Sequence, residues 1–178
     1  MGKNKSNLST EAKEWIKKIS SNGSEAFETI PKELFTEEFC NALIKKEGWA
    51  LGYIPDALRT EAVCLNAIQQ NGLMLEYVPE ALKTESLCLM AVESSGCLEY
   101  VPEVLKTETM CVAAYARKKY AEEYFPESIK TLFSDEKKLK DALYAHRKMK
   151  YIERHLQVKG REPTVEETAE YFRMYFKE

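Results

Sequence analysis

Five cysteines and two histidines are the side chains of this 178-residue chain best suited to metal or redox chemistry. Cys40, Cys64, Cys88 and Cys111 recur at intervals of 24, 24 and 23 residues. A zinc site needs such sulfur atoms within about 2.3 Å of one ion. Equivalent positions in stacked helical units lie about 8–10 Å apart, which also exceeds the reach of a disulfide. We therefore predict that these cysteines are small, buried apolar residues and that there is no metal site.

Cys97 stands outside this series, and its exposure to solvent is left open. His146 and His155 lie nine residues apart on one predicted helix, which is too far to share a metal ion. An odd number of cysteines without a secretory signal argues against a disulfide framework. The sequence therefore favours the reducing cytoplasm as the location of the protein.

Carboxylates are abundant, but they fall into rows that follow the same interval. Each acid of one row is followed three residues later by a base, a pairing worth about 0.2–0.5 kcal/mol on a surface. General acid–base catalysis instead needs titratable groups in unequal environments, and no nucleotide-binding or nucleophile motif occurs. We predict no catalytic residue, no cofactor and a non-enzymatic protein. The acids are Asp56, Glu80, Glu103 and Glu127, and the bases are Arg59, Lys83, Lys106 and Lys130.

An internal repeat of about 24 residues positions all of these side chains. Residues 53–61, YIPDALRTE, return as residues 77–85 and 100–108, with weaker copies at 30–37 and 124–131. Prolines and threonines keep the same interval as the cysteines. A fixed period of this length is the mark of a repeat architecture. The threonines are Thr36, Thr60, Thr84, Thr107 and Thr131.

One unit reads as two helices. Thr60 is suited to cap a long helix, because its hydroxyl can accept from a free backbone N–H, and the apolar spacing in 63–68 gives that helix one buried face. Residues 73–77 are predicted to form a second, short helix that Pro79 stops. A glycine is predicted to end each long helix. These glycines are Gly48, Gly72 and Gly96.

The predicted fold is all-α: a helical-hairpin repeat solenoid with a helical cap at each end. A unit this short cannot bury its own apolar face, so stability is shared between neighbours. We divide the chain into a disordered leader (1–8), an N-terminal capping helix (9–28), about four repeats (29–131) and a two-helix C-terminal cap (132–178). Met1-Gly2 fits a myristoylation pattern, but a polar leader or a cloning scar is the favoured interpretation.

These repeats resemble a family of short helical repeats of unknown function, with a motif close to V-P-E-x-L-K-T-x-E-x-C-L-x-A-V. The resemblance covers about residues 29–131 and is strongest over 53–98, and such repeats are typical of bacterial and large-virus proteins. It implies a helical array and brings no activity, cofactor or site residue. The chain departs from the motif at Asn41 and Lys119, and its third unit is one residue shorter between Gly96 and Tyr100.

The C-terminal segment differs from the repeats in charge. Residues 134–161 carry nine Lys/Arg and four acids, whereas residues 24–133 carry ten bases and eighteen acids. Ser134 is predicted to cap a long helix that runs to about Gln157, and Thr164 with Glu167 matches a capping box. A solvated face that complements the acidic repeats, a contact for an acidic protein and a nucleic-acid surface all remain open. The apolar side of the long helix is predicted to hold Leu139, Leu143, Met149, Ile152 and Leu156.

Comparison of the units shows where recognition could reside. The framework positions repeat, whereas the ends of the long helices vary, and stacking would align these ends as a surface strip. Free variation of exposed positions is the equally weighted alternative. The candidate partner-binding residues are Lys45, Lys46, Gln69, Gln70, Glu93, Arg117 and Lys118.

The sequence therefore predicts a protein–protein interaction module, an adaptor or an inhibitor, that binds a protein partner through the solenoid surface. A nucleic-acid-associated protein that uses the basic helix 137–161 is the first alternative, and a host-directed effector is the second. We expect a monomer with no membrane contact, because no apolar run approaches the roughly 18–20 residues that span a bilayer. The residues of the nucleic-acid alternative are Arg147, Lys148, Tyr151 and Arg154.

Overall fold

A computed structural model describes residues 8–175, so the Met1-Gly2 start and most of the predicted leader lie outside the described residues. Within 8–175 every regular element is a helix, which confirms the all-α prediction. The α-helices are α1 (Thr10–Asn22), α2 (Glu37–Lys46), α3 (Glu61–Gln70), α4 (Glu85–Ser95), α5 (Glu108–Arg117), α6 (Glu127–Phe133), α7 (Glu136–Lys159) and α8 (Val165–Tyr175). The 3₁₀ helices are η1 (Gly23–Thr29), η2 (Lys32–Leu34), η3 (Gly48–Tyr53), η4 (Asp56–Leu58), η5 (Gly72–Tyr77), η6 (Glu80–Leu82), η7 (Leu98–Tyr100), η8 (Glu103–Leu105) and η9 (Lys119–Tyr124).

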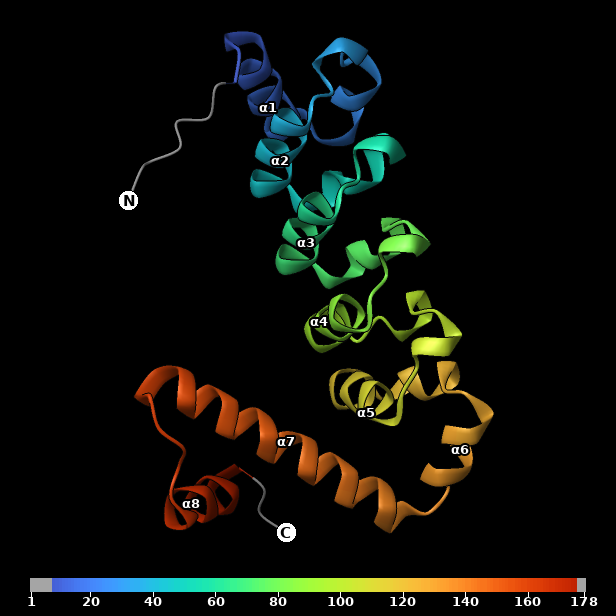
Figure 1. Ribbon diagram of the computed structural model, residues 1–178, viewed down its shortest axis with the longest axis vertical. Helices are drawn as coiled ribbons and strands as arrows, with labels where there is room; N and C mark the ends of the chain where they lie inside the picture. The colour runs from blue at the N-terminus through green and yellow to red at the C-terminus, as the bar shows by residue number, and fades with distance from the viewer. Residues whose placement is uncertain (1–7, 176–178) are drawn as a thin grey trace.

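Each unit combines one α-helix with two 3₁₀ helices, and the units lie one above another in a column (Figure 1). The predicted second helix is thus a 3₁₀ helix, a form that suits short segments because each bond spans only three residues. In the second unit η5 ends where the N–H of Val78 bonds to the carbonyl of Leu75. Val78 is extended, as expected of a residue before proline.

Threonine side chains begin the α-helices of the repeats, as predicted. The hydroxyl of Thr60 accepts from the N–H of Val63 at 3.5 Å, and that of Thr84 accepts from the N–H of Leu87 at 3.3 Å. Thr36 and Thr107 cap α2 and α5 in the same way. The fifth threonine departs from this pattern.

Thr131 lies inside α6, and its hydroxyl donates to the carbonyl of Ser128 at 2.9 Å. Where the other units have a three-residue 3₁₀ helix after the proline, this copy continues as α-helix from Glu127 to Phe133. The regular unit therefore ends before this helix, and α6 turns the chain toward α7 (Figure 1).

Small side chains fill the contact between neighbouring α-helices. The four periodic cysteines are completely buried, and so are Ala67, Ala91 and Ala114, which lie three residues after a cysteine. Consecutive α-helices from α2 to α5 pack against one another along this seam. The prediction that the periodic cysteines are buried packing residues is confirmed.

Cys97 is also completely buried, so the alternative that left its thiol exposed is wrong. Its sulfur lies 3.3 Å from the carbonyl oxygen of Gly72, in the preceding unit. The missing residue of the third unit explains this position. With one residue fewer, the 3₁₀ helix η7 starts only at Leu98, and Cys97 takes up the inward-facing place before it.

The glycines have two different roles, so the prediction that each ends a helix is right only for Gly96. Gly96 has φ +70°, the left-handed conformation that closes α4. Gly48 and Gly72 instead follow the last helical residue and its cap, and begin η3 and η5. There the neighbouring unit comes too close for a side chain: a Cβ on Gly72 would overlap the carbonyl oxygen of Ala91.

Arg59 and Lys83 join each unit to the next. The side chain of Lys83 is only 7% exposed, and its ammonium group pairs with Glu80 at 2.5 Å. The same ammonium group donates to the carbonyl of Tyr100, in the following unit, at 3.0 Å. Arg59 pairs with Asp56 and reaches a carbonyl of the following unit in the same way, at 3.0 Å. These pairs, expected to be surface contacts only, are clamps between units.

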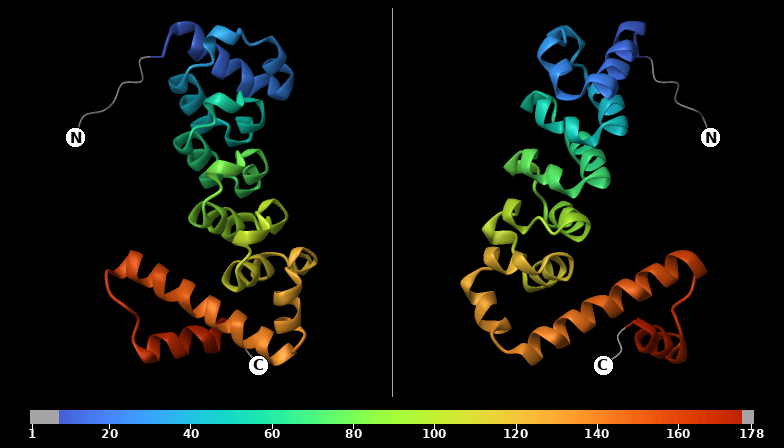
Figure 2. Two further views of the ribbon diagram at one scale, coloured as in Figure 1. Left: turned by 45° about the vertical axis from the view of Figure 1, so that its right-hand side comes forward. Right: turned by 180° about the vertical axis from the view of Figure 1, so that it is seen from behind.

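The C-terminal helices leave the column. The cap of α7 is Asp135 and not the predicted Ser134, whose hydroxyl donates to the carbonyl of Thr131 at 2.8 Å. The helix packs on α5 and α6, runs out past the column, and α8 folds back beside it (Figure 2). Its predicted apolar side is incompletely covered, because Met149 and Leu156 are exposed.

We predict that Gly72→Ala lowers the free energy of unfolding by about 1–3 kcal/mol, because the new methyl group forces α4 away from η5. Gly52→Ala is the matched control. The three atoms nearest to its Cβ would all belong to the ring of Tyr77, an exposed side chain that can move. We expect the control to lose less than about 1 kcal/mol. Chemical denaturation followed by circular dichroism measures both, and equal losses would contradict the proposed role of Gly72.

Candidate binding surfaces

The helix-end strip consists of the seven candidate partner-binding residues at the ends of α2–α5. Lys45, Lys46 and Gln69 are exposed. No hydrogen bond or ion pair holds these three side chains within residues 8–175. They are therefore available to a partner.

Other members of the strip hold the array together. Gln70 donates to the carbonyl of Ile44 at the end of the preceding helix. Arg117, the counterpart of Gln70 in the repeat register, donates to the carbonyl of Ser94 near the end of its own preceding helix, at 2.7 Å. Both side chains satisfy carbonyls that the end of an α-helix leaves unpaired. In two different units, a side chain at the same repeat position thus bonds to the end of the preceding helix.

Glu93 connects the helix-end strip to the C-terminal helices. Its carboxylate pairs with the ammonium group of Lys150 in α7 at 2.5 Å. Lys150 also pairs with Glu153 at 2.9 Å. Lys118, the remaining member, is half-buried and lies with its ammonium group 5.5 Å from the centre of the Tyr120 ring. The C-terminal end of the strip thus contacts α7.

A cleft of about 780 Å³ lies along α7, between the last turn of α5 and one side of α8. We call it the C-terminal cleft. Four Lys/Arg and two glutamates line it, together with both histidines and an apolar and aromatic wall. The cations are Arg147, Lys150, Arg154 and Lys159; the acids are Glu167 and Glu170; the wall includes Tyr151, Val158, Tyr171 and Met174.

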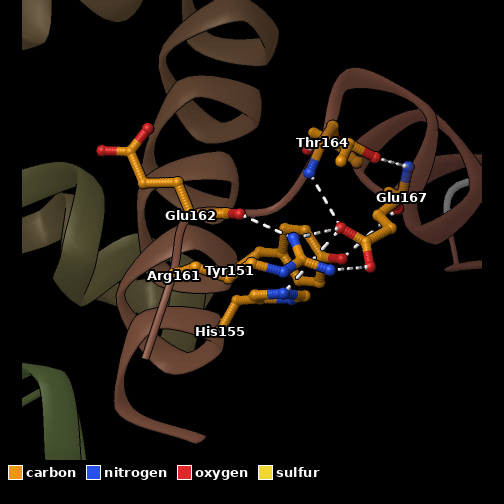
Figure 3. A network of polar contacts seen from close by, with 7 residues as sticks. Tyr151, His155, Arg161, Glu162, Thr164 and Glu167 are labelled. Carbon is orange, nitrogen blue, oxygen red and sulfur yellow. Dashed lines mark hydrogen bonds and ion pairs between the residues drawn. The ribbon is translucent and has the colours of Figure 1, made fainter. Parts of the chain in front are cut away.

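A polar network around Glu167, one of the residues that line the cleft, joins α7 to α8 (Figure 3). Thr164 and Glu167 form the predicted capping box: the N–H of Thr164 donates to the Glu167 carboxylate at 2.8 Å, and the N–H of Glu167 donates to the Thr164 hydroxyl at 3.2 Å. Arg161 grips the same carboxylate with two nitrogens, at 2.9 and 2.8 Å. The loop between α7 and α8 is therefore tied to the first turn of α8.

The aromatic side of α7 serves mainly to hold α8. The rings of Tyr151 and Tyr171 are stacked with centroids 4.1 Å apart, and those of Tyr144 and Phe172 lie 4.6 Å apart. The Tyr151 hydroxyl donates to the carbonyl of Glu167 at 3.3 Å. This side of the helix is an intramolecular contact, and only its edge faces the cleft.

The four residues of the nucleic-acid alternative separate in the structure. Arg147, Tyr151 and Arg154 line the C-terminal cleft, whereas Lys148 is exposed and lies outside it. On the helix, residues 147, 151 and 154 are one and two turns apart, but residue 148 is rotated by about 100° from its neighbour. The structure brings together three of the four.

His155 lines the cleft, although it was not among the candidate site residues. Its side chain is only 8% exposed, and its Nε2 atom is buried without a hydrogen-bond partner. The nearest charged group is the Glu167 carboxylate, 3.9 Å from Nε2 and already held by Arg161. The signal in the sequence was the helical spacing of His155 from Tyr151, four residues earlier, which placed both on one face.

No group of three or more metal-binding side chains converges within residues 8–175. In the same part of the chain, no helix is long and apolar enough to cross a membrane. The expected absence of a metal, a cofactor and a catalytic residue stays a prediction.

Comparison with known protein families gives one match. A family model described as "Domain of unknown function (DUF4116)" matches residues 36–83 and again residues 60–106. The chain is similar to that family over these residues. The two matches start 24 residues apart, the interval of the repeat, and together they cover α2–α4 and their connecting turns. No curated protein and no solved structure matches the chain.

We predict that all five thiols are inert in the folded protein. Burial raises the pKa of Cys40, Cys64, Cys88 and Cys111 from 9.0 to about 11, and it also raises the pKa of Cys97. At pH 8 the thiolate fraction of the first four is then on the order of one in a thousand. A disulfide reagent at pH 8 should react only after denaturant is added. Rapid reaction of any thiol without denaturant would contradict the burial.

The Arg161–Glu167 pair gives a prediction on pH. Hydrogen bonds from Arg161, and then from the N–H of Thr164, lower the pKa of Glu167 from 4.5 to about 2. A lowered carboxyl pKa means that the pair stabilises the loop above pH 4.5 and is lost as the pH falls toward 2. Carbon-13 NMR titration of the Glu167 carboxyl measures this midpoint. Arg161→Gln should return it toward 4.5, and a wild-type midpoint near 4.5 would refute the pairing.

Proposed function

We propose that the protein is a non-enzymatic binding module, an adaptor or an inhibitor, whose helix-end strip contacts an acidic segment of a protein partner. The observation that carries the proposal is the basic strip that the fold assembles on an acidic array. Its members include four Lys/Arg and one glutamate, on repeats in which acids outnumber bases eighteen to ten. The partner's acidic groups would find the complementary charge at this edge.

The arrangement of side chains along the strip supports recognition of one partner by several units at once. Gln70 and Arg117 are anchored on carbonyls of the preceding helix, so neighbouring helix ends keep a fixed spacing. Lys45, Lys46 and Gln69 project beside these anchors and are exposed. A row of independent side chains on a rigid framework can change its partner without a change in the core.

The adaptor, the inhibitor and the host-directed effector share this binding step and differ in what the partner does. We propose the cytoplasm as the compartment, and the free, buried cysteines support a reducing environment. We propose a monomer, because one column already buries the apolar seam of its units.

The test begins with capture of partners from the native host on the immobilised protein. The partner that binds is then purified, and its affinity is measured by calorimetry. Lys45→Glu/Lys46→Glu should weaken the complex about tenfold at low salt, and the difference should shrink as salt rises, because exposed charges are screened.

Lys137→Glu/Lys138→Glu is the matched control, since it reverses two adjacent exposed lysines at the start of α7, away from the strip. We expect its affinity to stay within about twofold of wild type. Recovery of nucleic acid instead of a protein partner would refute the proposal. Equal weakening by both pairs would show a diffuse charge effect and would also refute it.

A further inference from the structure

We propose that the C-terminal cleft binds a nucleotide, as a free molecule or as one unit of a single-stranded nucleic acid. This goes beyond protein binding by the helix-end strip and does not depend on it. The first support is size: at about 780 Å³ the cleft lies in the range of small-molecule sites, about 300–1,000 Å³.

The cations of the cleft supply the phosphate contact. Lys150 is occupied by Glu93 and Glu153, but the side chains of Arg154 and Lys159 have no hydrogen bond or ion pair among the described residues. Both line the cleft from the C-terminal half of α7. A guanidinium group binds phosphate oxygens in pairs, so Arg154 is the main anchor that we assign.

The wall of the cleft suits a base. Val158 and Met174 are apolar and largely exposed, and the stacked rings of Tyr151 and Tyr171 stand beside them. Proteins that bind single-stranded nucleic acids without base preference combine such apolar and aromatic surface, which contacts the base, with cations that contact the phosphate. An inorganic anion would leave this surface unused.

His155 gives a specific polar contact. Its side chain lines the cleft, and its Nε2 atom is buried and lacks a hydrogen bond. A buried polar atom without a partner is costly, so a turn of the ring that brings this atom to a ligand in the cleft is favoured. Neutral imidazole can donate or accept, and the edge of a base offers both kinds of partner.

The two acids at the cleft leave this assignment intact. Arg161 neutralises Glu167 through two hydrogen bonds, and the same carboxylate also accepts from the N–H of Thr164. Glu170 is exposed on α8. With Lys150 paired to Glu93 and Glu153, Arg154 and Lys159 still outnumber Glu170, the one lining acid that is not neutralised, so the cleft keeps a positive balance.

The test is an NMR titration of the full chain with adenosine monophosphate, with a short oligoadenylate and with inorganic phosphate. We expect saturable shifts of the His155 ring resonances with the first two probes and much weaker binding of phosphate. Tighter binding of oligoadenylate identifies a nucleic-acid strand as the source, and tighter binding of the monophosphate identifies the free nucleotide. Both results support the proposal.

Arg154→Gln should weaken binding of the better probe at least tenfold. Lys148→Gln, which removes the same charge from the same helix outside the cleft, should change it less than twofold. Val158→Asp, at an exposed position on the wall, should also weaken it. The proposal is overturned if neither nucleotide probe shifts His155, if phosphate binds as tightly as the monophosphate, or if the Arg154 and Lys148 variants weaken binding equally.

Discussion

The structure depends on the close contact between one unit and the next. Gly72 lies against the backbone of Ala91 with no room for a side chain, and the cysteine–alanine pairs form a seam of small, buried groups beside it. A unit of one α-helix and two short 3₁₀ helices has too little apolar surface to fold by itself. Separation of neighbours would expose that seam, so every surface feature on the column relies on this contact.

Much of the fold could be predicted, because residues with the same structural role recur at the same position in several units. Thr36, Thr60, Thr84 and Thr107 showed the helix starts, and the periodic cysteines showed the buried face. The details that failed are those that depend on a neighbour in space. The sequence could not show that Gly72 faces Ala91, that Cys97 turns inward, or that Lys83 reaches the carbonyl of Tyr100.

The candidate sites were predicted less completely for the same reason. Helical spacing placed Tyr151 and His155 on one face, but it could not show that α8 would cover the tyrosine and leave the Nε2 atom of the histidine unpaired. The helix-end strip followed from the period, whereas the pairing of Glu93 with Lys150 needed the path of α7. Contacts between segments distant in sequence decide which polar groups stay available.

The third unit shows how the array absorbs a change in length. It lacks one residue, yet α4 and α5 pack as their neighbours do, because Gly96 turns with a positive φ and η7 is shorter than its counterparts. The connecting turns thus act as buffers against small insertions and deletions. Duplication of a whole unit leaves each interface between units unchanged, so a repeat array of this kind can grow by one unit at a time.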